Sequence, residues 1–203
     1  MSEVDDRREL ERLLPGRRGH FRLESGHHGG LWLDLELLCF RPAEVQPLAE
    51  RLAGVLSRHS VEVICGPLVE GAFVALMVAG ALGLPFAYTE ARVSSRAEPL
   101  FPVDYLVPPA LRSRLRGRRV AVVNDVINAG SAVRGTLRSL RDCGAEPVAV
   151  ATLAVLGSSA ARLAAEAGVA LETLATLPNQ IWAPAECPLC AQRVPLSDSL
   201  GGP

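Results

Sequence analysis

The chain has 203 residues, of which 49% are hydrophobic, and its 21 basic and 22 acidic side chains leave a formal net charge of -1. This length predicts one globular domain, or one domain with a small appendage. Its core should be aliphatic, because aromatic residues make up only 4% of the chain. All 21 basic residues are arginine, which excludes lysine Schiff-base chemistry, pyridoxal phosphate anchoring and a Walker-A lysine. The near-zero charge argues against nucleic acid as a main partner.

The sequence predicts neither export nor a membrane span. Residues 1–14 are charged and lack the apolar core of a secretory signal. The longest apolar stretch, residues 72–84, has 13 residues, whereas a bilayer span requires roughly 18 to 20. The five cysteines lie mostly in apolar segments and suit reduced thiols better than a disulfide framework. We therefore expect a cytoplasmic protein without a membrane partner.

The first part of the chain combines short helices with a hairpin. Apolar spacing predicts an amphipathic helix over residues 3–14, ended by a Pro-Gly pair. Residues 19–26 alternate apolar and polar side chains and lead through a His-His-Gly-Gly turn into residues 31–35, a pattern that predicts a hairpin. Residues 43–58 have the apolar spacing of a surface helix.

From residue 61 onward, short apolar strands alternate with helical segments. This alternation predicts an α/β fold, a Rossmann-like parallel sheet flanked by helices, with ligands at the carboxyl ends of the strands. Residues 66–71 read as a turn, residues 91–99 as a polar loop and residues 100–107 as extended. The expected strands are residues 61–65, 85–89, 119–123, 147–156 and 169–174, and the expected helices are residues 72–82, 131–142 and 158–167.

The most informative segment joins the strand at 119–123 to the helix at 131–142. The strand ends in Asn124-Asp125, a short turn contains Gly130, and Ser131 is placed to cap the helix. Backbone N–H groups at a helix N-terminus bind a phosphate without any lysine, and Asp125 lies one short loop away, where it suits a sugar hydroxyl. The alternative is an ordinary strand, turn and helix with a capping serine.

The segment VAVVNDVINAGSA, residues 120–132, resembles the phosphoribosyl pyrophosphate loop of the type I phosphoribosyltransferases. The resemblance implies that the amides of the turn hold the 5-phosphate and that two acids hold the ribose hydroxyls. By position, Asp125 matches the second acid and Asn124 stands at the first, where it brings no charge to support the anomeric carbon. The residues assigned to substrate binding in this segment are Val126, Ile127, Asn128, Ala129, Gly130, Ser131 and Ala132.

Two further segments are similar to the orotate branch of that family. Residues 19–35, GHFRLESGHHGGLWLDL, resemble its N-terminal hood, and residues 64–92 resemble its pyrophosphate-loop region. The resemblance implies a hood over about residues 17–42 joined by about residues 176–203, with a core over about residues 43–175. It assigns five loop residues to pyrophosphate binding, with a plain sheet loop as the alternative: Pro67, Leu68, Val69, Glu70 and Gly71.

The resemblance implies an activity and its partners. The expected reaction transfers a phosphoribosyl group from phosphoribosyl pyrophosphate to a nucleobase, most simply orotate, with Mg²⁺ as cofactor and a homodimer as the assembly. Arg92 and Arg96 are assigned the cationic role of the family's missing catalytic-loop lysines, although an arginine does not readily release a proton near neutral pH. His27 and His28, in the hairpin turn, are candidate contacts to the base, with a solvated turn as the alternative.

Cys187 and Cys190 have the spacing of a metal knuckle, but zinc usually takes four ligands and the chain has no second such pair. Completion of a site by His27 and His28, or by a second copy of the chain, remains an alternative to a reduced structural pair.

Two rival functions also stay open. One is a regulatory protein that binds phosphoribosyl pyrophosphate or a nucleotide without turnover, favoured by Asn124 and the absent lysines. The other is transfer to a different base, favoured by Glu24, which would repel the carboxylate of orotate.

Overall fold

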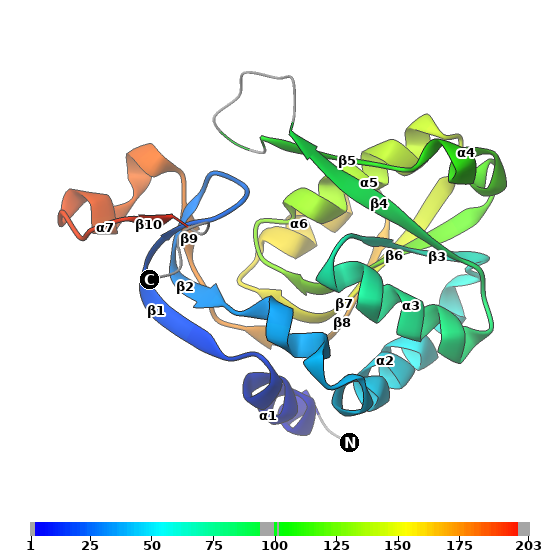
Figure 1. Ribbon diagram of the computed structural model, residues 1–203, viewed down its shortest axis with the longest axis horizontal. Coiled ribbons are helices and arrows are strands. Elements are labelled where there is room, and N and C mark those ends of the chain that lie inside the picture. Colours follow the sequence, from blue (N-terminus) through cyan, green and yellow to red (C-terminus); the bar gives the residue numbers. More distant parts are fainter. Residues whose placement is uncertain (1–2, 94–99, 101, 199–203) are drawn as a thin grey trace.

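The computed structural model describes residues 3–93, 100 and 102–198 and contains two sheets (Figure 1). The main sheet has the order β5-β4-β3-β6-β7-β8 and is parallel except for β5, which pairs antiparallel with β4 at one edge. This confirms the expected parallel sheet flanked by helices. Its strands are β3 (Val63–Pro67), β4 (Phe86–Val93), β5 (Val103–Leu106), β6 (Arg119–Ile127), β7 (Glu146–Leu156) and β8 (Ala170–Leu177).

Helices cover both faces of the main sheet. One face packs against α1 (Glu3–Leu13), α2 (Pro42–Leu56) and α3 (Glu70–Leu82). The other packs against α4 (Pro109–Leu115), α5 (Ser131–Asp142) and α6 (Ser159–Ala167). Because successive side chains of a strand point to opposite faces, the continuous apolar runs of β3, β6 and β7 supply both cores. No helix among the described residues is long and apolar enough to cross a membrane.

The hood is a second, four-stranded sheet with the order β10-β1-β2-β9. The hairpin β1 (Gly16–Arg22) and β2 (His28–Leu33) forms its centre, followed by the 3-10 helix η1 (Leu35–Phe40). The C-terminal segment returns to both edges: β9 (Ile181–Trp182) pairs with β2, and β10 (Ser197–Asp198) pairs with β1. Figure 1 shows this orange and red segment, with η3 (Pro184–Glu186) and α7 (Pro188–Ala191), beside the blue hairpin.

Several elements differ from the sequence-based expectation. The hairpin turn spans residues 23–27 and not 27–30, because β1 ends at Arg22 and residues 28–30 already belong to β2. Helix α4 was not expected, because Pro108 and Pro109 were taken as a break, whereas a proline also suits the first turn of a helix. Strand β4 continues to Val93, into the expected loop. Strand β6 continues to Ile127, because its pairing with β7 extends to Ile127 and Val155. Asn124 Nδ2 donates to Val126 O at 2.9 Å, and Thr152 Oγ1 donates to the backbone carbonyl of Asp125 at 2.8 Å.

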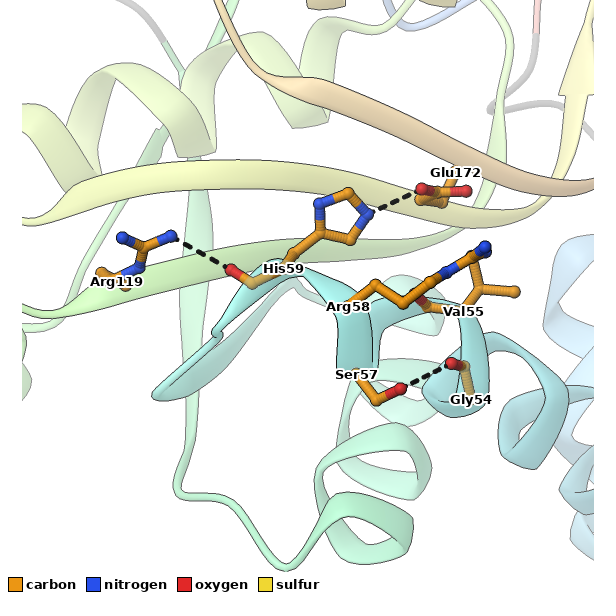
Figure 2. A network of polar contacts seen from close by, with 7 residues as sticks. All are labelled: Gly54, Val55, Ser57, Arg58, His59, Arg119 and Glu172. Carbon is orange, nitrogen blue, oxygen red and sulfur yellow. Dashed lines mark hydrogen bonds and ion pairs between the residues drawn. The ribbon is translucent and has the colours of Figure 1, made fainter.

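A polar network ties α2 to the amino ends of the strands (Figure 2). The short helix η2 (Ser57–His59) follows α2, and His59 Nε2 lies 2.6 Å from Glu172 Oε1 on β8. Arg119, the first residue of β6, donates to the carbonyl oxygens of His59 and Ser60. The C-terminal end of α2 is thereby fixed where the strands begin. The carboxyl ends of the strands, on the opposite side of the sheet, are left free to form a site.

Close packing of α3 on β3 requires glycine at position 66. A Cβ on Gly66 would lie 2.8 Å from both Ala72 Cα and Gly71 O, which are backbone atoms that cannot move aside. We expect Gly66→Ala to destabilise the protein by about 1 to 3 kcal/mol, the cost of overpacking. Gly80→Ala is the matched control on α3, because Gly80 is exposed with open space around it, and should stabilise by about 0.5 to 1 kcal/mol. Urea unfolding of both variants measures the difference, and equal midpoints would contradict this account of the packing.

Candidate active site

The carboxyl ends of β3 and β6 open beneath the hood into a cavity of about 330 Å³. Four carboxylates line it, from Glu24, Glu36, Glu70 and Asp125, and we call it the acidic cavity. The structure brings the two predicted binding segments together here, because residues 67–71 and 124–132 both line its wall. Parallel strands end at one edge of the sheet, and the loops after neighbouring strands therefore meet.

The turn between β6 and α5 presents a helix N-terminus to the acidic cavity. Gly130 has a φ of 80° and caps the helix, and a Cβ at this position would lie 2.6 Å from Leu163 Cδ1. The expected cap by Ser131 is therefore wrong: Ser131 is the first residue of α5, and its hydroxyl is directed to the hood instead. The free amides of the first turn of this 12-residue helix are placed to favour an anion in the cavity.

A carboxylate from the hood lies against this helix N-terminus. Glu24 Oε1 accepts a hydrogen bond from Ser131 Oγ at 3.0 Å. Tyr105 Oη donates to the same carboxylate, at 3.0 and 2.9 Å from its two oxygens. Burial and the charge of Glu24 raise the pKa of Tyr105, so the phenol keeps the proton that it donates. Glu24 thus places a carboxylate beside the N-terminus of α5, which is the position that suits a phosphate.

Asp125 lies near the end of β6 with 4% of its surface exposed. Burial raises the pKa of its carboxyl, the backbone N–H of Val126 opposes this shift and the charge of Glu70 adds to it, and together they bring the pKa to about 7. Asn124, its neighbour, is also buried, but its amide is hydrogen-bonded to the backbone of β6. Asp125 is therefore a carboxylate kept in a polar cavity without a cationic partner among the described lining residues.

The loop after β3 brings a second helix N-terminus to the cavity. Pro67 ends β3, the Leu68–Val69 peptide bond is cis, and α3 begins at Glu70. Leu68 N donates to Thr89 O at 2.9 Å, which ties the loop to the middle of β4. The cavity thus lies between the first turns of α3 and α5, and both helix dipoles favour anions there.

Comparisons with known proteins agree with this geometry. The family model described as the phosphoribosyl transferase domain matches residues 43–185. The chain belongs to the phosphoribosyltransferase family.

Relatives of this phosphoribosyltransferase align over most of their length. Orotate phosphoribosyltransferase of Desulforamulus reducens is 31% identical over 180 residues, which cover 87% of this chain and 85% of that protein. The orotate phosphoribosyltransferase of Thermotoga maritima is 31% identical over 188 residues, 92% of each chain. The crystal structure of orotate phosphoribosyltransferase from Aeropyrum pernix has a TM-score of 0.64 at 24% identity and covers 87% of this chain and 94% of that one. The predicted family and the type I fold are confirmed, and the chain is a pentosyltransferase.

Of the two arginines expected in the phosphoribosyltransferase site, Arg92 is not among the described residues that line the acidic cavity. Arg92 lies on the extended part of β4, is exposed, and pairs with Glu90 at 2.8 Å. Arg96 lies outside the described residues. His28, the first residue of β2, is buried in the hood and does not line the acidic cavity, whereas His27 precedes the strand.

His27 instead lines a second cavity of about 840 Å³, which also contains Arg134 and Arg162. We call it the arginine cavity. It shares Asn128 and Ala129 with the acidic cavity, so the two meet at the phosphate turn. Burial lowers the pKa of His27, and the charge of Arg162 lowers it further. Sequence reasoning missed Arg162 and Tyr105, because their approach to the turn depends on the packing of α6 and β5 rather than on a local motif.

The residues present fit a divalent metal ion of the kind that this family uses. Asp125 and Glu70 offer carboxylate oxygens, which are the ligands that Mg²⁺ prefers, often through its bound waters. The effect of Glu70 on the pKa of Asp125 reflects repulsion between the two carboxylates, which a cation would relieve. These two side chains are therefore the candidates to hold Mg²⁺ together with the substrate.

The raised pKa of Asp125 predicts that ligand-free protein loses stability as the pH rises. The folded state retains the proton up to pH about 7, whereas the unfolded chain releases it near 3.8, so the stabilisation is full below pH 3.8 and is lost as the pH rises through about 7. Asp125→Asn removes the buried charge and should stabilise the ligand-free protein at pH 8 by roughly 2 to 4 kcal/mol, with little effect near pH 4.

Unfolding in urea from pH 4 to 8, without Mg²⁺ or phosphate, measures this difference. Asp142→Asn, at the exposed far end of α5, is the control and should leave the pH profile unchanged. Parallel profiles for the wild type and Asp125→Asn would contradict the assignment of the raised pKa to Asp125.

Proposed function

We propose that this phosphoribosyltransferase transfers the 5-phosphoribosyl group of phosphoribosyl pyrophosphate to orotate and releases pyrophosphate. The observation that carries the proposal is the position of the buried Asp125 carboxylate, in a cavity between the N-termini of α3 and α5. Helix termini suit the two anionic ends of the donor, and a carboxylate between them suits its hydroxyl groups. The similarity to orotate phosphoribosyltransferases over most of the chain supports the same reaction.

In the proposed complex, the amides of residues 128–132 hold the 5-phosphate and the loop 67–71 faces the pyrophosphate. Asp125 accepts hydrogen bonds from ribose hydroxyls and places a negative charge near the anomeric carbon, where positive charge develops. A ring nitrogen of the base forms the new bond to that carbon and gives up its proton to water or to pyrophosphate. The carbon–oxygen bond to pyrophosphate breaks at the same time, and pyrophosphate leaves with the electron pair. Bound Mg²⁺ supplies charge neutralisation for the leaving group.

The charges on the two sides of the turn differ. Four carboxylates line the acidic cavity and would repel the carboxylate of orotate, whereas in the arginine cavity Arg134 and Arg162 stand beside Glu166 and Glu186. Arg162 lies in that cavity and is held loosely by Glu166, with 3.9 Å between Nε and Oε1. We therefore infer that the base enters from the side of α6, while the pyrophosphate lies on the side of α3.

We also propose Mg²⁺ as the cofactor, the cytoplasm as the location and a homodimer as the assembly. The support for the dimer is an apolar surface on two neighbouring elements, η1 and α3. Leu37, Phe40, Phe73 and Leu76 are all large and exposed there, and Phe40 has 77% of its surface exposed. Clustered exposed apolar side chains of this kind mark protein interfaces.

A rival function, binding without turnover, is favoured by two observations. Asn124 brings no charge to the place of the family's first acid, and its amide is occupied by the backbone of β6. Glu24 also occupies the hydroxyl of Ser131, which a phosphate would otherwise use. The two functions differ in whether pyrophosphate is released.

Pyrophosphate release from phosphoribosyl pyrophosphate and Mg²⁺, followed with orotate and with a panel of other bases, tests the function. We expect release with orotate, and we expect Asp125→Ala to reduce kcat/KM by about 30- to 1,000-fold, equal to roughly 2 to 4 kcal/mol of transition-state stabilisation. Asp142→Ala, at the other end of α5, is the control that should keep full activity.

Each other outcome has a distinct meaning. Release with a different base alone would replace orotate as the acceptor. No release, with a melting temperature that still rises on addition of phosphoribosyl pyrophosphate, would favour the rival binding function. Full activity of Asp125→Ala would contradict the proposed site.

The position of Glu24 predicts that it competes with phosphate. Because its carboxylate accepts a hydrogen bond from Ser131 at the N-terminus of α5, a bound phosphate must displace it or lie against its charge. We expect Glu24→Gln to tighten the binding of inorganic phosphate by roughly 3- to 10-fold, the scale of one partly screened charge. Isothermal titration calorimetry measures this Kd. Glu36→Gln, in the same cavity but on η1, is the control, and an equal effect of both variants would contradict a specific role of Glu24.

A further inference from the structure

Four metal-ligating side chains meet on the side of the hood where the C-terminal segment returns. His20 comes from β1 and His28 from β2, Cys187 directly precedes α7, and Cys190 lies within it. Their ligand atoms all lie within 4.8 Å of one another, and His20, His28 and Cys187 are buried. The cluster does not line the acidic cavity or the arginine cavity.

The spacing of the four ligand atoms is that of a tetrahedral metal site. Zinc–nitrogen distances of about 2.0 to 2.1 Å and zinc–sulfur distances of about 2.3 Å place neighbouring ligands roughly 3.3 to 3.8 Å apart. Here His20 Nε2 lies 3.1 Å from His28 Nδ1, 3.4 Å from Cys187 Sγ and 3.7 Å from Cys190 Sγ. Cys190 Sγ lies 3.2 Å from His28 Nδ1. Four of the six ligand pairs thus match tetrahedral spacing to a few tenths of an ångström, and the other two lie within 4.8 Å.

The hydrogen bond on the far side of His20 fixes which nitrogen faces the cluster. His20 Nδ1 lies 2.9 Å from the carbonyl oxygen of Val194, which can only accept a hydrogen bond, so Nδ1 carries the proton. Nε2 then presents its lone pair to the two sulfurs and to His28. Metal-ligating histidines commonly donate their second N–H to a backbone carbonyl in this way.

We propose that His20, His28, Cys187 and Cys190 bind one Zn²⁺ in a closed, structural site. Two thiolates and two imidazoles form a complete tetrahedral set, which leaves no position for a substrate and is typical of structural rather than catalytic zinc. Both cysteines are free, so their sulfurs are available as ligands. The spacing of Cys187 and Cys190 suggested a zinc site completed by His27 and His28. In the structure the two cysteines lie beside His20 and His28, whereas His27 lines the arginine cavity.

The metal fastens the C-terminal segment to the hairpin. The two histidines flank the turn at residues 23–27, which carries Glu24, and each cysteine lies between β9 and β10, the two strands that pair with the hairpin (Figure 1). Short two-residue strands supply little pairing energy by themselves. Zinc at this point therefore holds both edges of the hood in place.

Metal analysis of the full-length protein, purified with a reductant and passed through a gel-filtration column, tests the site. We expect one Zn²⁺ per chain in the wild type and near-complete loss of zinc in Cys187→Ser and Cys190→Ser. His27→Gln and Cys143→Ala are the matched controls, because each changes a residue of the same type outside the cluster, and both should retain the metal. Removal of zinc by a chelator should lower Tm by about 5 °C or more, because the metal binds the folded state.

Two readouts on the wild type do not depend on the folding of a variant. Cobalt(II) in place of zinc should give the intense visible bands of a tetrahedral ion and a thiolate-to-cobalt charge-transfer band. Alkylation followed by mass spectrometry should label Cys190, which is exposed, after chelation but not before. A metal-free protein with no cobalt spectrum, zinc retained in both serine variants, or a Cys187–Cys190 disulfide formed in the presence of reductant would overturn the proposal.

Discussion

The burial of one carboxylate at the end of β6 is the constraint on which the rest of the site depends. Asp125 is inside the sheet because β6 continues past it to Ile127, so the protein has to provide polar contacts where an ordinary strand would provide apolar ones. The backbone N–H of Val126 offsets part of the cost of the charge, but burial and Glu70 still raise the pKa of Asp125 to about 7. Hydroxyl donors and a cation from the substrate complex stabilise the charged form of this buried carboxyl. Asp125 therefore favours the protein with bound substrate over the ligand-free protein.

The two helix N-termini complete this arrangement without a lysine. Arginine and lysine bring mobile charge on long side chains, whereas the amides of α3 and α5 are fixed by the packing of each helix on the sheet. Gly66 permits α3 to approach β3, and Gly130 provides the left-handed turn before α5. The absence of lysine from the chain is thus compatible with the binding of two phosphate groups, since the fold supplies fixed dipoles for both.

The sequence predicted much of the fold and only part of the site. The alternation of apolar strands and helices, and the turn around Gly130, depend on local patterns, and both were recovered. Helix α4 was missed because two adjacent prolines also mark breaks, and β6 was predicted too short because the polar pair Asn124-Asp125 was taken as the end of the strand. Tyr105 and Arg162 carry no local signal, and the partnership of His20 with Cys187 spans 167 residues, so these contacts depend on topology that spacing cannot reveal.

The hood joins the N-terminal hairpin to the C-terminal segment, which are far apart in the sequence. Glu24 lies in the turn of the β1–β2 hairpin, and the histidines that flank this turn belong to the proposed zinc site. A metal at that point limits rotation of the hairpin as a whole, so that Glu24 is held over α5 by the hood rather than by its own two hydrogen bonds. Exchange of this carboxylate for a phosphate then requires a change of one side chain and not the opening of the hood. The cost of preparing the site is correspondingly small, because a single rotamer change disturbs fewer contacts than the movement of a four-stranded sheet.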